Sequence, residues 1–317
     1  MKQLAQQIHQ HILLSKKIVV IPHQNPDGDA LGSATAFHEY LLALKKDAHI
    51  FCVTPVNCKL HFVPHNHKTA GDASILEGAD TIILLDSGDK RYAGVDSLLA
   101  NHPATVINID HHATDENYGH INLVNPKAAS TTEILYHYFK HNRIAISPKM
   151  ATSLLTGLAT DTSNFSNSAT SATALMVGGD LIRCGGNYNL ITDATVKNIS
   201  VDALRLWGKI LGRLVKDEKN NIIHTYITNQ DLIEHKVSET ESDGIANFLN
   251  NLENTGAALL LRETADGLVK GSFRTTRDDI DVSAMAKKLG GGGHKKAAGF
   301  TVAGTIEEVL RKILICG

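Results

Sequence analysis

The first residues that could do chemistry together are a histidine and two aspartates that follow a short apolar run. His23, Asp27 and Asp29 are spaced by four and two residues, and they come directly after the β-branched residues 18–21. A Pro and a Gly between them suit a sharply turning loop in which alternate side chains converge. The alternative interpretation is an ordinary surface turn rich in Asp and Gly.

Three further groups of this kind occur along the chain, each after an apolar stretch. They are Asp86 after 82–85, Asp110, His111 and His112 after 106–109, and Asp161 after 154–159. Asp86 or Asp161 alone would be typical of a helix end. An Asp followed by paired histidines is a stronger indication of a site, with a buried structural Asp–His pair as the alternative.

These groups would meet if the apolar runs are strands of one parallel sheet, because ligands bind outside the carboxyl ends of such strands. Several carboxylates on one rim repel one another unless cations hold them together. Mixed oxygen and imidazole ligands suit Mn²⁺, Fe²⁺ or Mg²⁺. The number of groups favours a two-metal centre, which activates water and offsets charge on phosphate oxygens during hydrolysis.

The elements that must position these groups alternate between strands and helices. Strands are expected at 18–21, 81–85 and 105–109, and helices at 4–14, 30–44, 131–140, 148–158 and 171–182. After a helix at 201–215, strands are expected at 222–227, 257–261, 268–273 and 299–302, and helices at 229–236, 243–252, 281–289 and 305–315. We therefore predict an α/β fold. It has an N-terminal parallel-sheet domain with helices on both faces and a smaller C-terminal α/β domain.

The second domain contains a basic, glycine-rich stretch. Four glycines at 290–293 precede His294 and two lysines, and would let backbone N–H groups approach an anion closely. Arg274 ends a nearby strand and could grip a phosphate with two hydrogen bonds. Residues 270–296 hold seven Lys or Arg and three Asp, a local balance of 7 − 3 = +4. A flexible hinge and a solvated surface are the alternatives.

The four acidic and imidazole groups, in this order and setting, resemble the four motifs of the DHH phosphoesterases. That family includes RecJ-type exonucleases, family II inorganic pyrophosphatases and NrnA-type oligoribonucleases that also dephosphorylate 3′-phosphoadenosine 5′-phosphate. The resemblance covers nearly the whole chain and implies two metal ions that share one aspartate. Their ligands would be His23, Asp27 and Asp86 for one ion, and Asp29, Asp86, His111 and Asp161 for the other.

The same resemblance implies two catalytic residues. His112 would face the substrate phosphate or the leaving oxygen, and Asp110 would orient His111. One departure follows the last motif, where the family often has Thr-Gly and this chain has Thr162-Ser163. That difference affects the expected shape of the loop and leaves the metal assignment alone.

The glycine-rich stretch and the Ser-x-Arg strand resemble the DHH-associated substrate-binding domain, whereas family II pyrophosphatases carry a different second domain. The implied nucleotide contacts are Ser272, Arg274, Gly291, Gly292, Gly293 and His294. We expect residues 1–185 to form the catalytic domain, 186–215 a linker with a connector helix, and 216–317 the substrate-binding domain.

The resemblance implies a Mn²⁺-dependent phosphoesterase, with Mg²⁺ or another divalent ion as alternatives. It would cut RNA oligonucleotides of about two to five residues to mononucleotides and dephosphorylate 3′-phosphoadenosine 5′-phosphate, a range that rests on the family alone. A linear dinucleotide hydrolase in cyclic-dinucleotide turnover is the second interpretation, and a non-catalytic nucleotide-binding or sensing protein the third. The intact set of candidate ligands weighs against the third. The oligomeric state is left open, with a homodimer among the options.

Composition excludes several other classes. The net charge is 31 − 33 = −2 and aromatic residues make up 5%, which disfavours a basic, aromatic groove for long nucleic acids. The sequence contains neither a GxxxxGK[ST] pattern nor an HExxH pattern, which argues against an ATPase and a zincin protease. No apolar run approaches the about 18 residues of a membrane span, and the N-terminus lacks a signal-peptide pattern. Four scattered cysteines fit reduced thiols, so we expect a cytoplasmic protein without a membrane partner. Of its 17 histidines, only the four named above lie where chemistry is expected.

Overall fold

The computed structural model describes residues 1–238, 244–249, 252 and 255–315. The chain divides into two compact units, residues 1–198 and 199–317. No helix within the described ranges is both long and apolar enough to cross a membrane.

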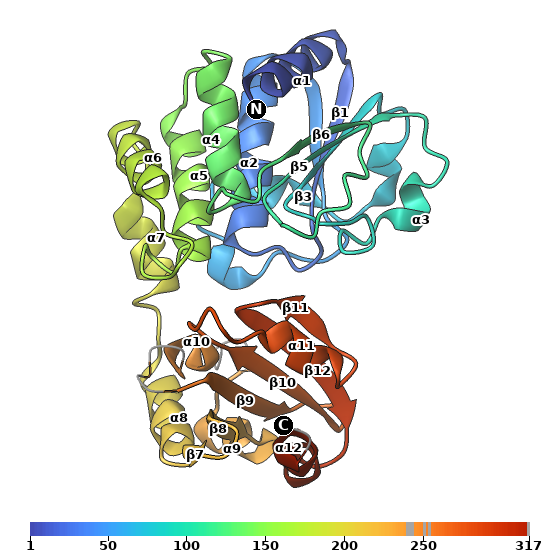
Figure 1. Cartoon of the computed structure of the whole chain (residues 1–317). Coiled ribbons are helices and arrows are strands. Elements are labelled where there is room, and N and C mark those ends of the chain that lie inside the picture. The colour runs from blue at the N-terminus through green and yellow to red at the C-terminus, as the bar shows by residue number, and fades with distance from the viewer. Residues whose placement is uncertain (239–243, 250–251, 253–254, 316–317) are drawn as a thin grey trace. The chain divides into compact units, whose positions relative to one another are not determined.

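The first unit is built on a sheet of six parallel strands in the order β3-β2-β1-β4-β5-β6 (Figure 1). The strands are β1 (Lys17–Pro22), β2 (Asp47–Phe51), β3 (Thr69–Ala70), β4 (Thr81–Leu85), β5 (Thr105–Asp110) and β6 (Ile121–Val124). The chain runs outward from β1 to β3 and then returns to add β4 on the other side of β1. The carboxyl ends of β1 and β4 therefore flank a topological switch point, where open α/β sheets bind their ligands.

Alternating side chains of the strands face opposite layers. Ile18, Val20 and Ile83 pack with the helices of one face, and Ile21 and Leu84 pack on the other. The first face is covered by α1 (Lys2–Leu14), α2 (Gly28–Ala43), α4 (Thr131–His141) and α5 (Pro148–Asp161), with α6 (Ala172–Arg183) and α7 (Tyr188–Thr195) beyond them. The other face is covered by short elements, η3 (Ala73–Leu76) and α3 (Asp96–Leu99). Helices thus lie on both faces, as predicted.

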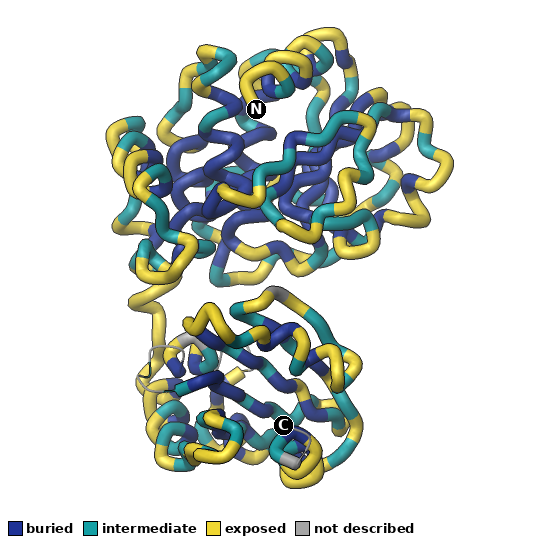
Figure 2. The backbone as a smooth tube through the Cα atoms, viewed as in Figure 1, coloured by how far each residue is buried: buried dark blue, intermediate teal, exposed yellow. Residues whose placement is uncertain are grey.

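Helices α2 and α5 pack unusually closely, and both are dark blue along most of their length in Figure 2. A Cβ added at Gly32 would lie 2.3 Å from the carbonyl oxygen of Ser153 in α5. Only glycine fits such an approach. This contact fixes α5 against α2, and α5 ends at Asp161, so it also fixes the last of the predicted ligands relative to the first three.

The second unit is a mixed sheet in the order β11-β12-β10-β9-β8-β7, in which β8 and β9 are parallel and the other pairs antiparallel. The strands are β7 (Val215–Asp217), β8 (Ile222–Ile227), β9 (Ala257–Glu263), β10 (Leu268–Arg274), β11 (Gly292–His294) and β12 (Ala297–Ala303). One face packs on α8 (Val201–Leu211), α9 (Asn229–His235) and α10 (Ile245–Leu249), and the other on α11 (Val282–Lys287) and α12 (Ile306–Ile315). The predicted smaller α/β domain is confirmed.

Several elements differ from the sequence prediction. The helix expected at 201–215 ends at Leu211, because Val215 begins β7 and pairs with His224 of β8. Its buried residues join the core of the second unit with Ile227 and Leu232. Strands β2, β3, β6, β7 and β11 and helices α3 and α7 were not expected. The helix expected at 243–252 is α10, and residues 243, 250 and 251 lie outside the described ranges.

Candidate metal centre

The loop between β1 and α2 carries the first three predicted ligands. His23 directly follows β1, and Asp27 is the N-cap of α2. One oxygen of Asp27, Oδ1, accepts hydrogen bonds from the backbone N–H groups of Asp29 and Ala30, at 2.9 and 3.0 Å. The cap therefore fixes the turn that the Pro and Gly suggested. Asp29 lies in the first turn of α2 with its side chain fully buried.

Asp86 lies directly after β4, in the middle of the rim. Its backbone is left-handed, with φ at 58°, a conformation that Asp tolerates better than most residues. Its N–H donates to the carbonyl oxygen of Ile109 at 3.1 Å, and the hydroxyl of Thr131 donates to its Oδ1 at 3.0 Å. The carboxylate is thus held from β5 and from the start of α4.

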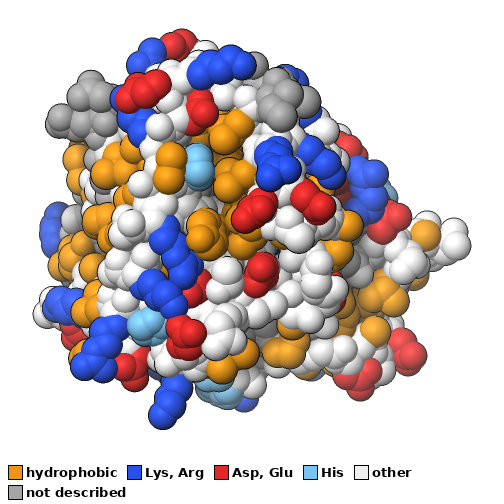
Figure 3. All heavy atoms as spheres, turned by 90° about the horizontal axis from the view of Figure 1, so that it is seen from below, with side chains coloured by type: hydrophobic (Ala, Val, Ile, Leu, Met, Phe, Trp, Pro, Cys, Tyr) orange, Lys and Arg blue, Asp and Glu red, His pale blue; other side chains and the backbone are white. Residues whose placement is uncertain are grey.

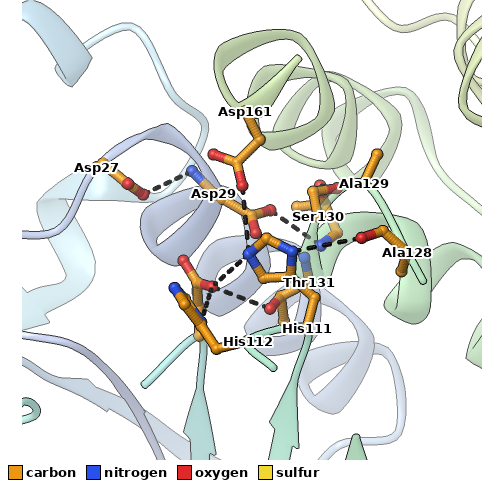
Figure 4. A network of polar contacts seen from close by, with 12 residues as sticks. Asp27, Asp29, His111, His112, Ala128, Ala129, Ser130, Thr131 and Asp161 are labelled. Atoms are coloured by element: carbon orange, nitrogen blue, oxygen red, sulfur yellow. Dashed lines mark hydrogen bonds and ion pairs between the residues drawn. The ribbon is translucent and has the colours of Figure 1, made fainter. Parts of the chain in front are cut away.

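Asp110 ends β5 and organises the two histidines after it. Its Oδ1 accepts hydrogen bonds from the backbone N–H groups of His111 and His112, at 2.6 and 3.2 Å, and from Nδ1 of His112 at 2.7 Å. Asp110 therefore contacts the ring of His112 and the backbone of His111. The ring of His111 instead donates from Nδ1 to the carbonyl oxygen of Ala128, at 3.4 Å (Figure 4).

This hydrogen bond turns Nε2 of His111 toward the carboxylates, at 3.5 Å from Oδ1 of Asp86 and 3.4 Å from Oδ2 of Asp161. His23 has the same arrangement. Its Nδ1 lies 2.8 Å from the carbonyl oxygen of Gln24, and its Nε2 lies 3.8 Å from Oδ2 of Asp86. A backbone acceptor for one ring nitrogen leaves a lone pair on the other, which is the usual arrangement of a metal-binding imidazole.

The sequence analysis placed the start of α4 correctly but missed its part in the site. The backbone N–H groups of Thr131 and Thr132 donate to the two oxygens of Asp29, at 2.6 and 2.9 Å. The only signal in the sequence was a helix start, Ser130 followed three residues later by Glu133. Ser130 does cap α4, accepting from the N–H of Glu133 at 3.0 Å.

Three groups of side chains could each hold a cation, since their ligand atoms lie within 4.8 Å of one another. They are His23, Asp27 and Asp86; Asp29, His111 and Asp161; and Asp86, Asp110, His111 and His112. Asp86 belongs to the first and third of these groups, and His111 belongs to the second and third. The structure therefore brings together all six residues predicted as ligands, together with both residues predicted as catalytic.

The electrostatics of the rim fit divalent cations. Burial, and then the neighbouring Asp29, Asp27, Asp161 and Asp110, raise the pKa of Asp86 well above its ordinary value. Burial and the carboxylates of Asp29 and Asp27 do the same to the pKa of Asp161. Burial and mutual repulsion thus disfavour ionisation of these carboxylates together, and divalent cations would offset that cost. The residues present thus fit a divalent metal site.

The residues predicted to contact the nucleotide all lie in the second unit. Arg274 of β10 pairs with Ala297 of β12, which pairs with His294 of β11. Ser272 and Gly292 form the matching row two residues along, again across β12. This register places these residues close together, at the same end of the sheet. The side chain of His294 lies outside what the structure describes.

Two of the glycines next to His294, Gly292 and Gly293, lie in strand β11, and Gly291 directly precedes it. A Cβ at Gly291 would lie 2.1 Å from the carbonyl oxygen of Gly299, and one at Gly293 would lie 2.6 Å from that of Ala297. Close packing on β12 therefore explains two of the three glycines. At Gly292 an added Cβ would meet nothing within 4 Å, so this backbone stays open to a ligand.

Comparison with known proteins identifies the domains. Residues 17–158 match the DHH family N-terminal domain, and residues 219–314 match the DHHA1 domain. The chain carries a DHH domain and a DHHA1 domain. Each match lies within one of the two units of the fold, and of the six predicted metal ligands Asp161 lies just beyond the end of the DHH match.

Two relatives and one solved structure illustrate the similarity. The bifunctional oligoribonuclease and PAP phosphatase NrnA of Thermus thermophilus is 29% identical over 94% of this chain and 88% of its own length. The protein of that name from Bacillus subtilis is 24% identical over 92% of this chain and 91% of its own length. The crystal structure of an exopolyphosphatase-related protein from Bacteroides fragilis matches the fold with a TM-score of 0.92, 24% identity, and coverage of 100% of this chain and 96% of that one.

Proposed function

We propose that this DHH protein hydrolyses short oligoribonucleotides to mononucleotides and dephosphorylates 3′-phosphoadenosine 5′-phosphate. The observation that carries the proposal is the position of Asp86 at the switch point of the sheet, where it shares a ligand group with His23 and Asp27 and also lies beside His111 of the group with Asp29 and Asp161. The names of the full-length relatives support the choice of substrates. The expectations of a cytoplasmic location and of a homodimer belong to the same proposal.

The residues that would hold two ions are His23, Asp27 and Asp86 for one, and Asp29, Asp86, His111 and Asp161 for the other. We propose Mn²⁺, because two imidazoles among carboxylates suit it better than Mg²⁺, which prefers oxygen ligands alone. When bound, the cations supply water of lowered pKa and positive charge opposite the phosphate oxygens.

The chain's own contribution to the reaction centres on His112. Although burial opposes protonation, the hydrogen bond and charge of Asp110 raise the pKa of His112. The imidazolium donates from Nδ1 to Asp110 and so holds its second proton at Nε2. That proton would neutralise charge on the phosphate or on the leaving oxygen. We propose that Arg274 and the open backbone at Gly292 bind the nucleotide in the DHHA1 domain.

A substrate panel with Mn²⁺ tests the proposal. It compares a diribonucleotide, a longer oligoribonucleotide, 3′-phosphoadenosine 5′-phosphate and pyrophosphate by initial rates. Faster turnover of the first and third is expected. No turnover of any compound would favour the non-catalytic interpretation, and preference for pyrophosphate would overturn the nucleotide assignment.

The linear dinucleotide hydrolase differs from this proposal only in substrate preference. Adding 5′-phosphorylated linear dinucleotides to the panel separates the two. Turnover of those compounds at least about ten-fold above all other substrates, a difference of about 1.4 kcal/mol in transition-state binding, would move the assignment to the alternative.

A further inference from the structure

A pocket of about 550 Å³ opens in the DHH domain beyond β2, beside the metal-site loop. Its walls come from the segment after β2, from the loop around η2 (Asn66–Lys68) and from β3. The lining residues are Cys52, Val53, Thr54, Pro55, Val56, His61, Asn66, His67, Thr69, Ala70 and Gly71. This volume lies in the range of small-molecule sites. None of these residues has a part in the function proposed above.

The pocket is tied directly to the loop that carries His23. The thiol of Cys52 donates to the carbonyl oxygen of His23 at 3.7 Å. The N–H of Asn25 donates to the hydroxyl of Thr54 at 2.5 Å. Strands β1 and β2 are parallel with Val20 opposite Ile50, so their carboxyl ends lie on the same rim. Neighbouring strands are about 4.8 Å apart, so the pocket begins at the strand next to the one that leads into the metal-site loop.

The chemistry of the walls favours a nucleobase over a phosphate. No Lys, Arg, Asp or Glu lines the pocket, and about half of the lining is apolar. Two imidazole rings, His61 and His67, can stack on or hydrogen-bond to a base. The hydroxyl oxygen of Thr69 is buried and has no hydrogen-bond partner among the described residues. A buried polar atom of this kind calls for a partner, and rotation of the Thr69 side chain to another rotamer would be needed to bring the hydroxyl to a base edge.

We propose that this pocket is a nucleobase subsite, which holds the base of the nucleotide whose phosphate lies at the metal centre. The inference rests on the proposed function. It adds a substrate determinant within the DHH domain itself. It also gives a role to two histidines that the sequence alone assigned to the ordinary surface.

Equilibrium binding tests the subsite without requiring turnover. The ligands are adenosine 5′-monophosphate and its base-free counterpart ribose 5-phosphate, titrated calorimetrically in the presence of Mn²⁺. Thr69→Val removes the unpartnered hydroxyl, and the double change of His61→Ala with His67→Ala removes the rings. Each should weaken adenosine monophosphate binding about ten-fold, as loss of one stacked or hydrogen-bonded contact does. Binding of ribose 5-phosphate should stay unchanged.

A variant that fills the pocket and a control variant complete the test. The nearest atom to a Cβ added at Gly71 is the carbonyl oxygen of Cys52, at 3.7 Å, so Gly71→Leu can occupy the pocket without backbone strain. This variant should weaken binding of adenosine monophosphate and leave binding of ribose 5-phosphate unchanged. His141→Ala is the control, because it removes a histidine from the far end of α4.

The outcomes separate the two proposals. Equal loss for both ligands, or no loss for the nucleotide in any pocket variant, would overturn the subsite. Absence of phosphoester hydrolysis by a protein that still distinguishes the two ligands in this way would overturn the proposed function and leave the subsite standing.

Discussion

At the scale of single residues, Asp86 is the central carboxylate of the site. It contacts the ring of His23 on one side and that of His111 on the other, and it accepts the hydroxyl of Thr131. Its left-handed backbone restricts which substitutions test its charge alone. Asn also tolerates this conformation, and therefore Asp86→Asn changes the charge with little strain.

We expect Asp86→Asn to lower turnover by more than about 100-fold, because loss of even an outer-shell partner of a metal costs about 10–100-fold. The thermal midpoint of the metal-free protein should stay unchanged or rise, since one of several repelling carboxylates is neutralised. Initial rates and calorimetry measure both. Asp193→Asn, which neutralises an exposed carboxylate on α7, is the control and should leave the rate unchanged. Normal turnover of Asp86→Asn would show that Asp86 does not bridge the two ions.

The loop after Asp161 contains three consecutive residues with a strained backbone conformation. Ser163, Asn164 and Phe165 are all left-handed, with φ between 49° and 61°. The family resemblance places a glycine at the first of these positions, where this chain has Ser163. The loop keeps the left-handed shape that glycine would adopt, at a cost of about 1–2 kcal/mol for a residue with a Cβ.

Ser163→Gly should therefore stabilise the protein by about 0.5 kcal/mol, because relief of this cost exceeds the about 0.5–1 kcal/mol that a flexible glycine adds to the unfolded state. Urea unfolding measures the change. Asn164→Gly should give a smaller gain, because Asn already tolerates this conformation. A loss of stability in Ser163→Gly would mean that its weak hydroxyl contact with Asn167 outweighs the strain.

At the scale of elements, the site depends on how α2, α4 and α5 meet. Asp29 in α2 lies between the N–H groups that begin α4 and the glycine of α5 closest to it. A Cβ at Gly157 would lie 2.5 Å from Oδ1 of Asp29 and 2.5 Å from Cγ2 of Thr132. Because Gly157 has no side chain, the carboxylate of Asp29 fits against α5.

Gly157→Ala should displace Asp29 and lower turnover by at least about ten-fold, with a loss of about 1–3 kcal/mol in the free energy of unfolding from overpacking. The matched control is Gly179→Ala in α6, where an added Cβ meets nothing within 4 Å. That change should stabilise the protein by up to about 1 kcal/mol through helix propensity and leave the rate unchanged. Full activity of Gly157→Ala would show that α5 does not set the position of Asp29.

The same elements show what the sequence can and cannot predict. The strands that carry the site are runs of β-branched residues in the middle of the sheet, so β1, β4 and β5 were placed, and the side chains at their ends with them. Edge strands such as β6 (INLV) are short and only partly buried, and were missed. The partners of Asp29 and of the His111 ring are backbone groups of residues 128–132. Backbone groups have no residue signature, and these contacts therefore could not be predicted from the sequence.

At the scale of the whole molecule, the net charge of −2 averages an acidic rim with a local stretch of 7 − 3 = +4 at residues 270–296 of the second domain. On the face shown in Figure 3, the described basic and acidic side chains are interspersed and form no continuous basic track. Long nucleic acids need such a track. The charge of the rim, by contrast, makes the stability of the DHH domain depend on cations.

The pH dependence of that stability can be worked out from the rim. Folding raises the pKa values of Asp86, Asp161 and Asp29, so their protonated forms stabilise the fold. That contribution is full below the unfolded pKa of about 3.9 and is lost as pH rises through the raised values. His23 and His112, whose pKa values are also raised, act in the same direction. Bound cations take the place of the lost protons, so the benefit of Mn²⁺ should grow as pH rises.

We therefore expect the difference in thermal midpoint between protein with Mn²⁺ and protein with a chelator to widen from pH 5 to pH 8. At a free ion concentration of 100 times the dissociation constant, binding adds about 2.7 kcal/mol, which corresponds to about 5–10 °C for a domain of this size. Calorimetry at each pH measures the difference. In Asp86→Asn the widening should shrink, because one of the raised carboxylates is gone. A constant difference across this range would mean that the rim carboxylates are already ionised without metal, and that the repulsion between them is balanced by the protein alone.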